Sequence, residues 1–127
     1  MKQKGFSIRK RIRSFGYAFN GLRILIREEE NAKIHLLAAL CVLIAGVFLK
    51  ISQIEWIAII LAIGLVISLE AINTSIENIS DFVSPEKHMW IKKIKDLSAA
   101  GVLIGAITAA IVGLIIFIPK LLELFQK

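Results

Sequence analysis

The sequence predicts an all-α integral membrane protein with an N-terminal amphipathic surface helix followed by three transmembrane helices. Of its 127 residues, 57% are hydrophobic, against about 45–50% in a typical soluble domain. The excess lies in three uncharged segments, residues 36–49, 56–69 and 97–119. Three such segments in so short a chain leave little polar surface for a soluble bundle of helices. We therefore expect one membrane domain covering residues 1–127.

The three apolar segments set the limits of the expected membrane spans. Only the third segment has the length of about 20 residues that a bilayer requires, so the others need their flanking residues. The dipeptide Ser84-Pro85 should end the helix of the second span. Asp96 or Ser98 can cap the start of the third. The expected spans are residues 33–50, 54–80 and 96–119.

Residues 6–30 have the pattern of an amphipathic helix. Basic side chains flank one mainly apolar side, as in helices that lie in the headgroup layer of a membrane. A nucleic-acid partner is disfavoured, because this basic segment is attached to membrane spans. The apolar positions are Phe6, Ile8, Ile12, Phe15, Phe19, Leu22 and Ile26.

The placement of positive charge predicts the orientation of the spans. The formal net charge is +6, and nine of the sixteen Lys and Arg residues precede the first apolar segment. The first connection holds only Lys50, whereas the second holds Lys87, Lys92, Lys93 and Lys95. The positive-inside rule then places the N-terminus and the second connection in the cytoplasm.

Four polar residues follow the second apolar segment at helical spacing. A helix advances about 100° per residue, which puts Glu70, Asn73, Glu77 and Asp81 on one narrow stripe. Carboxylates at membrane depth are costly unless they face protein, water or a cation. The stripe therefore suggests a site that binds a multivalent cation, and such sites usually bind phosphates as well. For Glu70 and Glu77 the alternative is a polar contact between helices, and for Asp81 it is a solvated helix end.

These residues suit phosphoryl transfer. The scaffold would be an unusual one, because the chain has no G-x-x-x-x-G-K-[S/T] loop. That reaction requires mainly that two oxygens lie in line and that phosphate charge is neutralised. Carboxylates can hold Mg²⁺, and Lys95 can engage a phosphate. Glu70, the deepest acid, can take the proton of a lipid hydroxyl, while Glu77 lies nearer the cytoplasm, ATP and metal.

The motif Glu70-Ala71-Ile72-Asn73-Thr74-Ser75-Ile76-Glu77, followed by Asp81 and by Lys95-Asp96, closely resembles the prokaryotic diacylglycerol kinase and undecaprenol kinase family. The junction Glu29-x-Asn31-x-x-x-His35 is also similar, and looks more like the undecaprenol kinase branch. His35 is expected to order the start of the first span. The resemblance covers about residues 6–118.

The resemblance implies a homotrimer in the plasma membrane of a bacterium, with active sites at subunit boundaries. It also implies ATP as co-substrate and Mg²⁺ as cofactor. Glu28 and Glu30 stay open as alternatives to Glu29, since three glutamates are consecutive. The implied roles are Glu70 as catalytic base, Glu29 and Glu77 as metal ligands that also contact nucleotide, Asn73 as support, Lys95 and Asp96 as nucleotide contacts, and Lys10 and Arg13 as phosphate contacts.

The expected function is a lipid kinase that transfers the γ-phosphoryl group of ATP to undecaprenol, with diacylglycerol as the alternative acceptor. A small proton-coupled transporter subunit would explain the buried acids but would leave Lys95, Asp96 and Glu29 without a role. A structural assembly protein would use the small residues of the third span and would leave the acids unexplained. Those small residues are Gly101, Gly105, Ala109 and Gly113.

Overall fold

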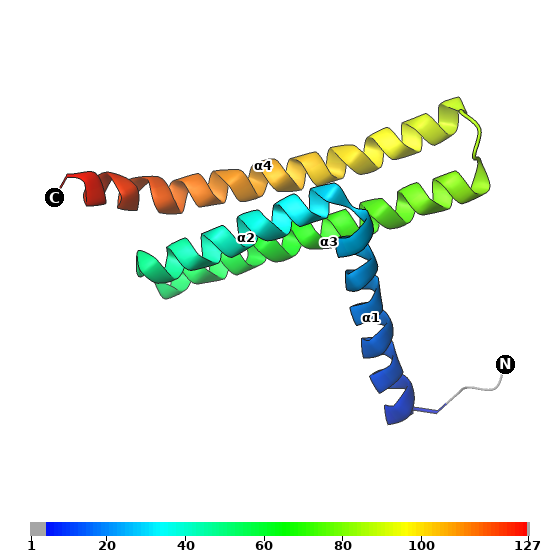
Figure 1. Cartoon of the computed structure of the whole chain (residues 1–127), viewed down its shortest axis with the longest axis horizontal. Coiled ribbons are helices and arrows are strands. Elements are labelled where there is room, and N and C mark those ends of the chain that lie inside the picture. The colour runs from blue at the N-terminus through cyan, green and yellow to red at the C-terminus, as the bar shows by residue number, and fades with distance from the viewer. Residues whose placement is uncertain (1–4, 127) are drawn as a thin grey trace.

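The computed structural model describes residues 5–126, and these form four α-helices. Helices α2, α3 and α4 pack lengthwise, with α3 in contact with both of the others. Helix α1 leaves this bundle steeply from the point where α2 begins (Figure 1). The helices are α1 (Ile8–Glu28), α2 (Glu30–Phe48), α3 (Gln53–Val83) and α4 (Met89–Phe125).

Helices α2, α3 and α4 are each long and apolar enough to cross a membrane. Most of their large apolar side chains are exposed, including Phe48 and Phe82, which are 76% and 90% exposed. Such surfaces suit contact with lipid hydrocarbon rather than with water. The expectation of three long apolar helices after a first helix is therefore confirmed.

A short break between α1 and α2 redirects the chain. The side chain of Ser7 caps α1 by accepting a hydrogen bond of 3.4 Å from the backbone N–H of Lys10. At the other end Glu29 adopts an extended conformation, with φ −107° and ψ 113°. Helix α2 then begins at Glu30, three residues before the expected span. The break turns α1 away from α2 and leaves Glu29 outside both helices.

The connection between α2 and α3 is a tight turn with a small core beneath it. Lys50 has a φ of 53°, a left-handed conformation common just after a helix. Ser52 and Glu55 then form a capping box, with hydrogen bonds of 3.0 and 3.2 Å. Ile51 is buried in this turn and packs with Ile59 of α3. These local interactions fix α2 antiparallel to the first half of α3.

Helix α4 is longer than expected at both ends. It begins at Met89, about two turns before Asp96, so the expectation that Asp96 or Ser98 caps the helix is wrong. The side chain of His88 caps this earlier start by accepting a hydrogen bond of 3.2 Å from the Trp90 backbone. The helix also continues through Pro119 to Phe125. An apolar stretch marks the part of a helix suited to lipid and does not mark where the helix ends.

Only some of the small residues of α4 pack closely against another helix of the same protomer. A methyl group added at Gly105 would lie 2.5 Å from the Leu69 Cδ1 atom, so α3 and α4 approach closely there. The same addition at Gly101 or Gly113 would meet no described atom within 4 Å. Close helix packing in this protomer therefore depends on Gly105 alone among these three glycines.

Candidate functional site

The polar stripe predicted from the sequence lies on the unbroken second half of α3. Glu70 is 2% exposed and is the most deeply buried polar side chain among the described residues. Asn73 and Glu77 are half-buried, and Asp81 is exposed. The stripe thus runs from a buried carboxylate to a solvated one along a single helix.

His35 of α2 lies opposite the buried end of this stripe. Its Nε2 atom is 3.2 Å from Oε1 of Glu70. The contact lacks the geometry of a hydrogen bond, and Oε1 has no hydrogen-bond partner among the described residues. The sequence indicated that His35 orders the start of α2, but it did not predict the contact with Glu70. The spacing from Glu29 through Asn31 to His35 was the signal that marked this histidine.

Glu29 brings a third carboxylate to the same region from the break between α1 and α2. Burial raises the pKa of Glu29, and the negative charges of Glu77, Glu70 and Glu28 raise this pKa further. Glu29 is half-buried, whereas Glu28 and Glu30 are exposed. Of the three consecutive glutamates, Glu29 therefore stands where it interacts with the acids of α3.

The carboxylates are close enough to interact electrostatically but do not form a preassembled metal cage. Within residues 5–126 no group of three or more His, Cys, Asp or Glu side chains could hold a metal ion. Mg²⁺ commonly binds one or two carboxylates and completes its shell with water and substrate phosphates. Glu29 and Glu77 fit that pattern, because the mutual repulsion that raises the pKa of Glu29 favours a bound cation.

Two further buried oxygen atoms near Glu70 have no hydrogen-bond partner within residues 5–126. They are Oδ1 of Asn73 and Oγ1 of Thr74. Leaving a buried polar group unpaired costs about 1–3 kcal/mol. Clusters of such groups in a native protein require an explanation, and a ligand site is a common one. This region of α3 therefore has the polar character expected of a binding site.

Lys95 and Asp96, two of the residues expected to contact nucleotide, are both engaged in ion pairs. Lys95 of α4 pairs with Asp81 of α3 across the helix interface. Asp96 accepts a 2.6 Å hydrogen bond from Lys92, one turn earlier on α4. Lys95 lies on the face of α4 directed at the polar stripe, which sequence periodicity alone did not show.

Lys10 and Arg13 do not join the carboxylates within this protomer. Both are exposed and lie in the first turns of α1. That end of α1 points away from α2, α3 and α4 (Figure 1). Within one protomer, these two side chains therefore lie far from any phosphate bound at the acids of α3.

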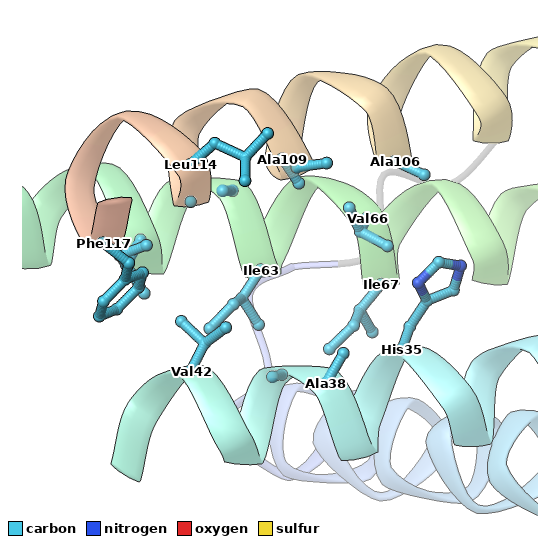
Figure 2. A pocket seen from close by; sticks show the side chains of 15 residues that line it. His35, Ala38, Val42, Ile63, Val66, Ile67, Ala106, Ala109, Leu114 and Phe117 are labelled. Atoms are coloured by element: carbon cyan, nitrogen blue, oxygen red, sulfur yellow. The ribbon is translucent and has the colours of Figure 1, made fainter. Parts of the chain in front are cut away.

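An apolar groove of about 540 Å³ adjoins the buried end of the stripe. It lies between α2 and α4 over the middle of α3, and His35 is the one polar side chain among its lining residues. Figure 2 shows His35 at the end of the groove near Ala106, with Phe117 at the opposite end. The arrangement can place an apolar chain beside a buried acid, with a charged region further along α3.

Comparison with known proteins agrees with this geometry. The chain is 41% identical to undecaprenol kinase of Bacillus subtilis over 109 residues, which cover 86% of this chain and 89% of that protein. It is 36% identical to a diacylglycerol kinase of Helicobacter pylori over 107 residues, covering 84% and 81%. It is 34% identical to a diacylglycerol kinase of Synechocystis over 112 residues, covering 87% and 64%.

A family model gives the same assignment over most of the chain. The model for prokaryotic diacylglycerol kinase matches residues 16–117. This range includes Glu29, the polar stripe of α3 and the neighbouring residues Lys95 and Asp96. The matched relatives are named kinases of lipid alcohols. The chain therefore belongs to the prokaryotic diacylglycerol kinase family and is a lipid kinase.

Proposed function

We propose that this lipid kinase transfers the γ-phosphoryl group of ATP to the hydroxyl group of undecaprenol, giving undecaprenyl phosphate. Two observations support this acceptor. The chain is 41% identical to a protein named undecaprenol kinase, and it carries the Glu29-x-Asn31-x-x-x-His35 junction. Diacylglycerol is the second candidate acceptor, because other relatives are named diacylglycerol kinases. Family membership disfavours the transporter and assembly alternatives.

The observation that carries the mechanism is the burial of Glu70 beside an apolar groove. A carboxylate that is 2% exposed can meet the hydroxyl of a lipid whose chain stays in an apolar environment. As the acceptor oxygen attacks the γ-phosphorus, its proton passes to Glu70 and the bond to the bridging oxygen of ADP breaks. We therefore assign Glu70 as the general base and the neighbouring Asn73 as a polar support for it.

Glu29 and Glu77 are the proposed ligands of Mg²⁺. Mg²⁺ held by these two carboxylates would supply positive charge that neutralises the phosphoryl group during its transfer. Burial and then the negative charge of Glu77 raise the pKa of Glu29, and a cation held by both carboxylates would relieve their repulsion. Glu29 lies at the break between α1 and α2, and Glu77 lies on α3 about two turns beyond Glu70.

The nucleotide would lie at the end of the bundle where α3 and α4 are joined. Lys95 and Asp96 are near the start of α4 at this end. We propose that they contact ATP, which must then displace the present partners Asp81 and Lys92. This end carries the positive charge of the second connection, so we place it at the cytoplasmic face of the cell membrane, with the N-terminus on the same side.

We further propose that the active enzyme is a homotrimer. The basic side chains of Lys10 and Arg13 are exposed at the far end of α1 from the acids. A neighbouring subunit would allow them to approach phosphates that they cannot approach in their own protomer. The extensive exposed apolar surface of α2, α3 and α4 is also consistent with helix contacts between subunits.

The test is turnover by the purified protein in detergent micelles with γ-labelled ATP, Mg²⁺ and each lipid in turn. We expect label in undecaprenyl phosphate, with a higher kcat/KM for undecaprenol than for diacylglycerol. Glu70→Gln keeps the size of the side chain and should lower kcat about 10²- to 10⁴-fold while leaving assembly intact. Undiminished turnover in this variant would reject Glu70 as the base. A higher kcat/KM for diacylglycerol would instead reject the proposed acceptor.

A further inference from the structure

We propose that His35 is a positioning residue that holds one oxygen of Glu70, so that the other oxygen faces the acceptor hydroxyl. This inference rests on the proposed role of Glu70 as the base. It assigns to His35 a part in catalysis beyond ordering the start of α2. The residue would act through Glu70 and would not itself exchange a proton with the substrate.

The first support is the contact between the two side chains. Nε2 of His35 lies 3.2 Å from Oε1 of Glu70, and Oε1 has no hydrogen bond from any described residue. A carboxylate that lacks a hydrogen-bond donor is free to rotate about its last bond. A small rotation of the imidazole would turn the contact into an N–H···O hydrogen bond, as often happens when a substrate binds.

The second support is the position of His35 between two cavities. On one side it is the one polar side chain in the lining of the apolar groove of about 540 Å³ (Figure 2). On the other side, His35 and Glu70 both line a closed space of about 20 Å³ beneath Leu22 and Leu25 of α1. His35 is therefore where the apolar groove meets the buried acid, and α1 covers the pair.

The chemistry of the pair fits a donor and an acceptor. A neutral imidazole with its hydrogen on Nε2 donates to one carboxylate oxygen, and this role needs no change of protonation during the reaction. The second oxygen, Oε2, then has a fixed direction in which to accept the proton of the acceptor hydroxyl. Fixing a reacting group in this way lowers the activation barrier without adding a contact to the substrate.

A purely structural role for His35 makes a different prediction. If the imidazole only fills space between α2 and α3, an apolar side chain of similar size would serve equally well. If it only binds the lipid, its loss would raise the KM for lipid and leave kcat unchanged. The positioning role requires a donor at the reach of Nε2 and predicts a change in kcat.

The experiment compares His35→Gln, His35→Asn and His35→Leu in the full-length protein. The amide nitrogen of glutamine has about the reach of Nε2, whereas that of asparagine has about the reach of Nδ1. We expect His35→Gln to keep kcat within about threefold, and the other two variants to lose about tenfold or more, a part of what the base contributes. The KM for ATP should stay unchanged in all three. Size-exclusion chromatography and thermal unfolding monitor assembly and folding.

The outcomes separate this inference from the proposed function. Equal kcat values for the glutamine and asparagine variants, or a loss confined to the KM for lipid, would overturn the positioning role. If His35→Leu does not fold, the two amide variants still decide the question. In the Glu70→Gln background His35→Asn should cause no further loss. Turnover retained by Glu70→Gln would reject the base itself, whatever the histidine variants show.

Discussion

The ion pair between Lys95 and Asp81 predicts that ATP must displace a competitor in order to bind. Lys95 is the cation proposed to contact phosphate, yet it is paired with the carboxylate of Asp81 on α3. If both interactions use the same ammonium group, part of the phosphate interaction is spent on breaking the ion pair. Asp81→Asn removes the competing charge and keeps the shape of the side chain.

The size of the effect follows from the exposure of the pair. The side chains of Lys95 and Asp81 are 36% and 64% exposed, so water and salt screen their attraction. Ion pairs of this kind contribute about 0.2–1 kcal/mol. Removing that competition should tighten ATP binding by about 1.4- to 5-fold. The gain should be largest at low ionic strength and should shrink as salt is added.

The assay measures initial rates against ATP concentration at saturating lipid, in low and in high salt. We expect Asp81→Asn to lower the KM for ATP within that range and to leave kcat unchanged. Glu86→Gln is the matched control, because Glu86 is an exposed acid in the connection just after α3 and forms no ion pair with a described residue. In a Lys95→Ala background, Asp81→Asn should have no effect.

Three results would refute this reasoning. A higher KM for ATP in Asp81→Asn would mean that Asp81 itself takes part in binding metal or nucleotide. An equal gain in Glu86→Gln would mean that the general electrostatic field, and not the ion pair, is responsible. A gain that persists without Lys95 would mean that this lysine is not the group released.

Two further predictions concern stability in detergent. Gly46→Ala should lower the free energy of unfolding by about 1–3 kcal/mol, because the new methyl group would lie 2.8 Å from the rigid Trp56 ring. Gly64→Ala is the control and should be neutral or stabilising, because a methyl group there meets no described atom within 4 Å. Equal melting temperatures for the two variants would contradict the prediction. Burial and neighbouring acids raise the pKa of Glu29 above its ordinary value of 4.5, so its stabilising contribution is present below that value and is lost as the pH rises. Glu29→Gln should therefore unfold at a higher temperature than the native protein at pH 7 but not at pH 4, and a pH-independent difference would contradict this.

The sequence predicted the features that depend on a single helix. The order of a first helix and three long apolar helices follows from composition, and the alignment of Glu70 with Glu77 follows from the helical period. The end of α3 was also predictable, because Pro85 removes a backbone donor and restricts the residue before it.

The features that the sequence did not predict all involve two elements. The contact of His35 with Glu70 and the pairing of Lys95 with Asp81 depend on which faces of α2 and α4 meet α3. Periodicity defines a face on each helix but does not say which face lies opposite it. The early start of α4 was missed for a related reason, because hydropathy reports the apolar segment and the cap at His88 lies well outside it.

The polar groups of this site are costly for the isolated protomer, and this cost supports a functional assignment. Burial and the charges of three other acids raise the pKa of Glu29. Near Glu70, two buried oxygen atoms, those of Asn73 and Thr74, have no hydrogen-bond partner in the part of the chain that the structure describes. Selection for stability alone would remove such groups, and natural proteins retain them mainly where function needs them. Each of these groups can be satisfied by a cation, a phosphate or a hydroxyl, which are the chemical groups that a lipid kinase brings together.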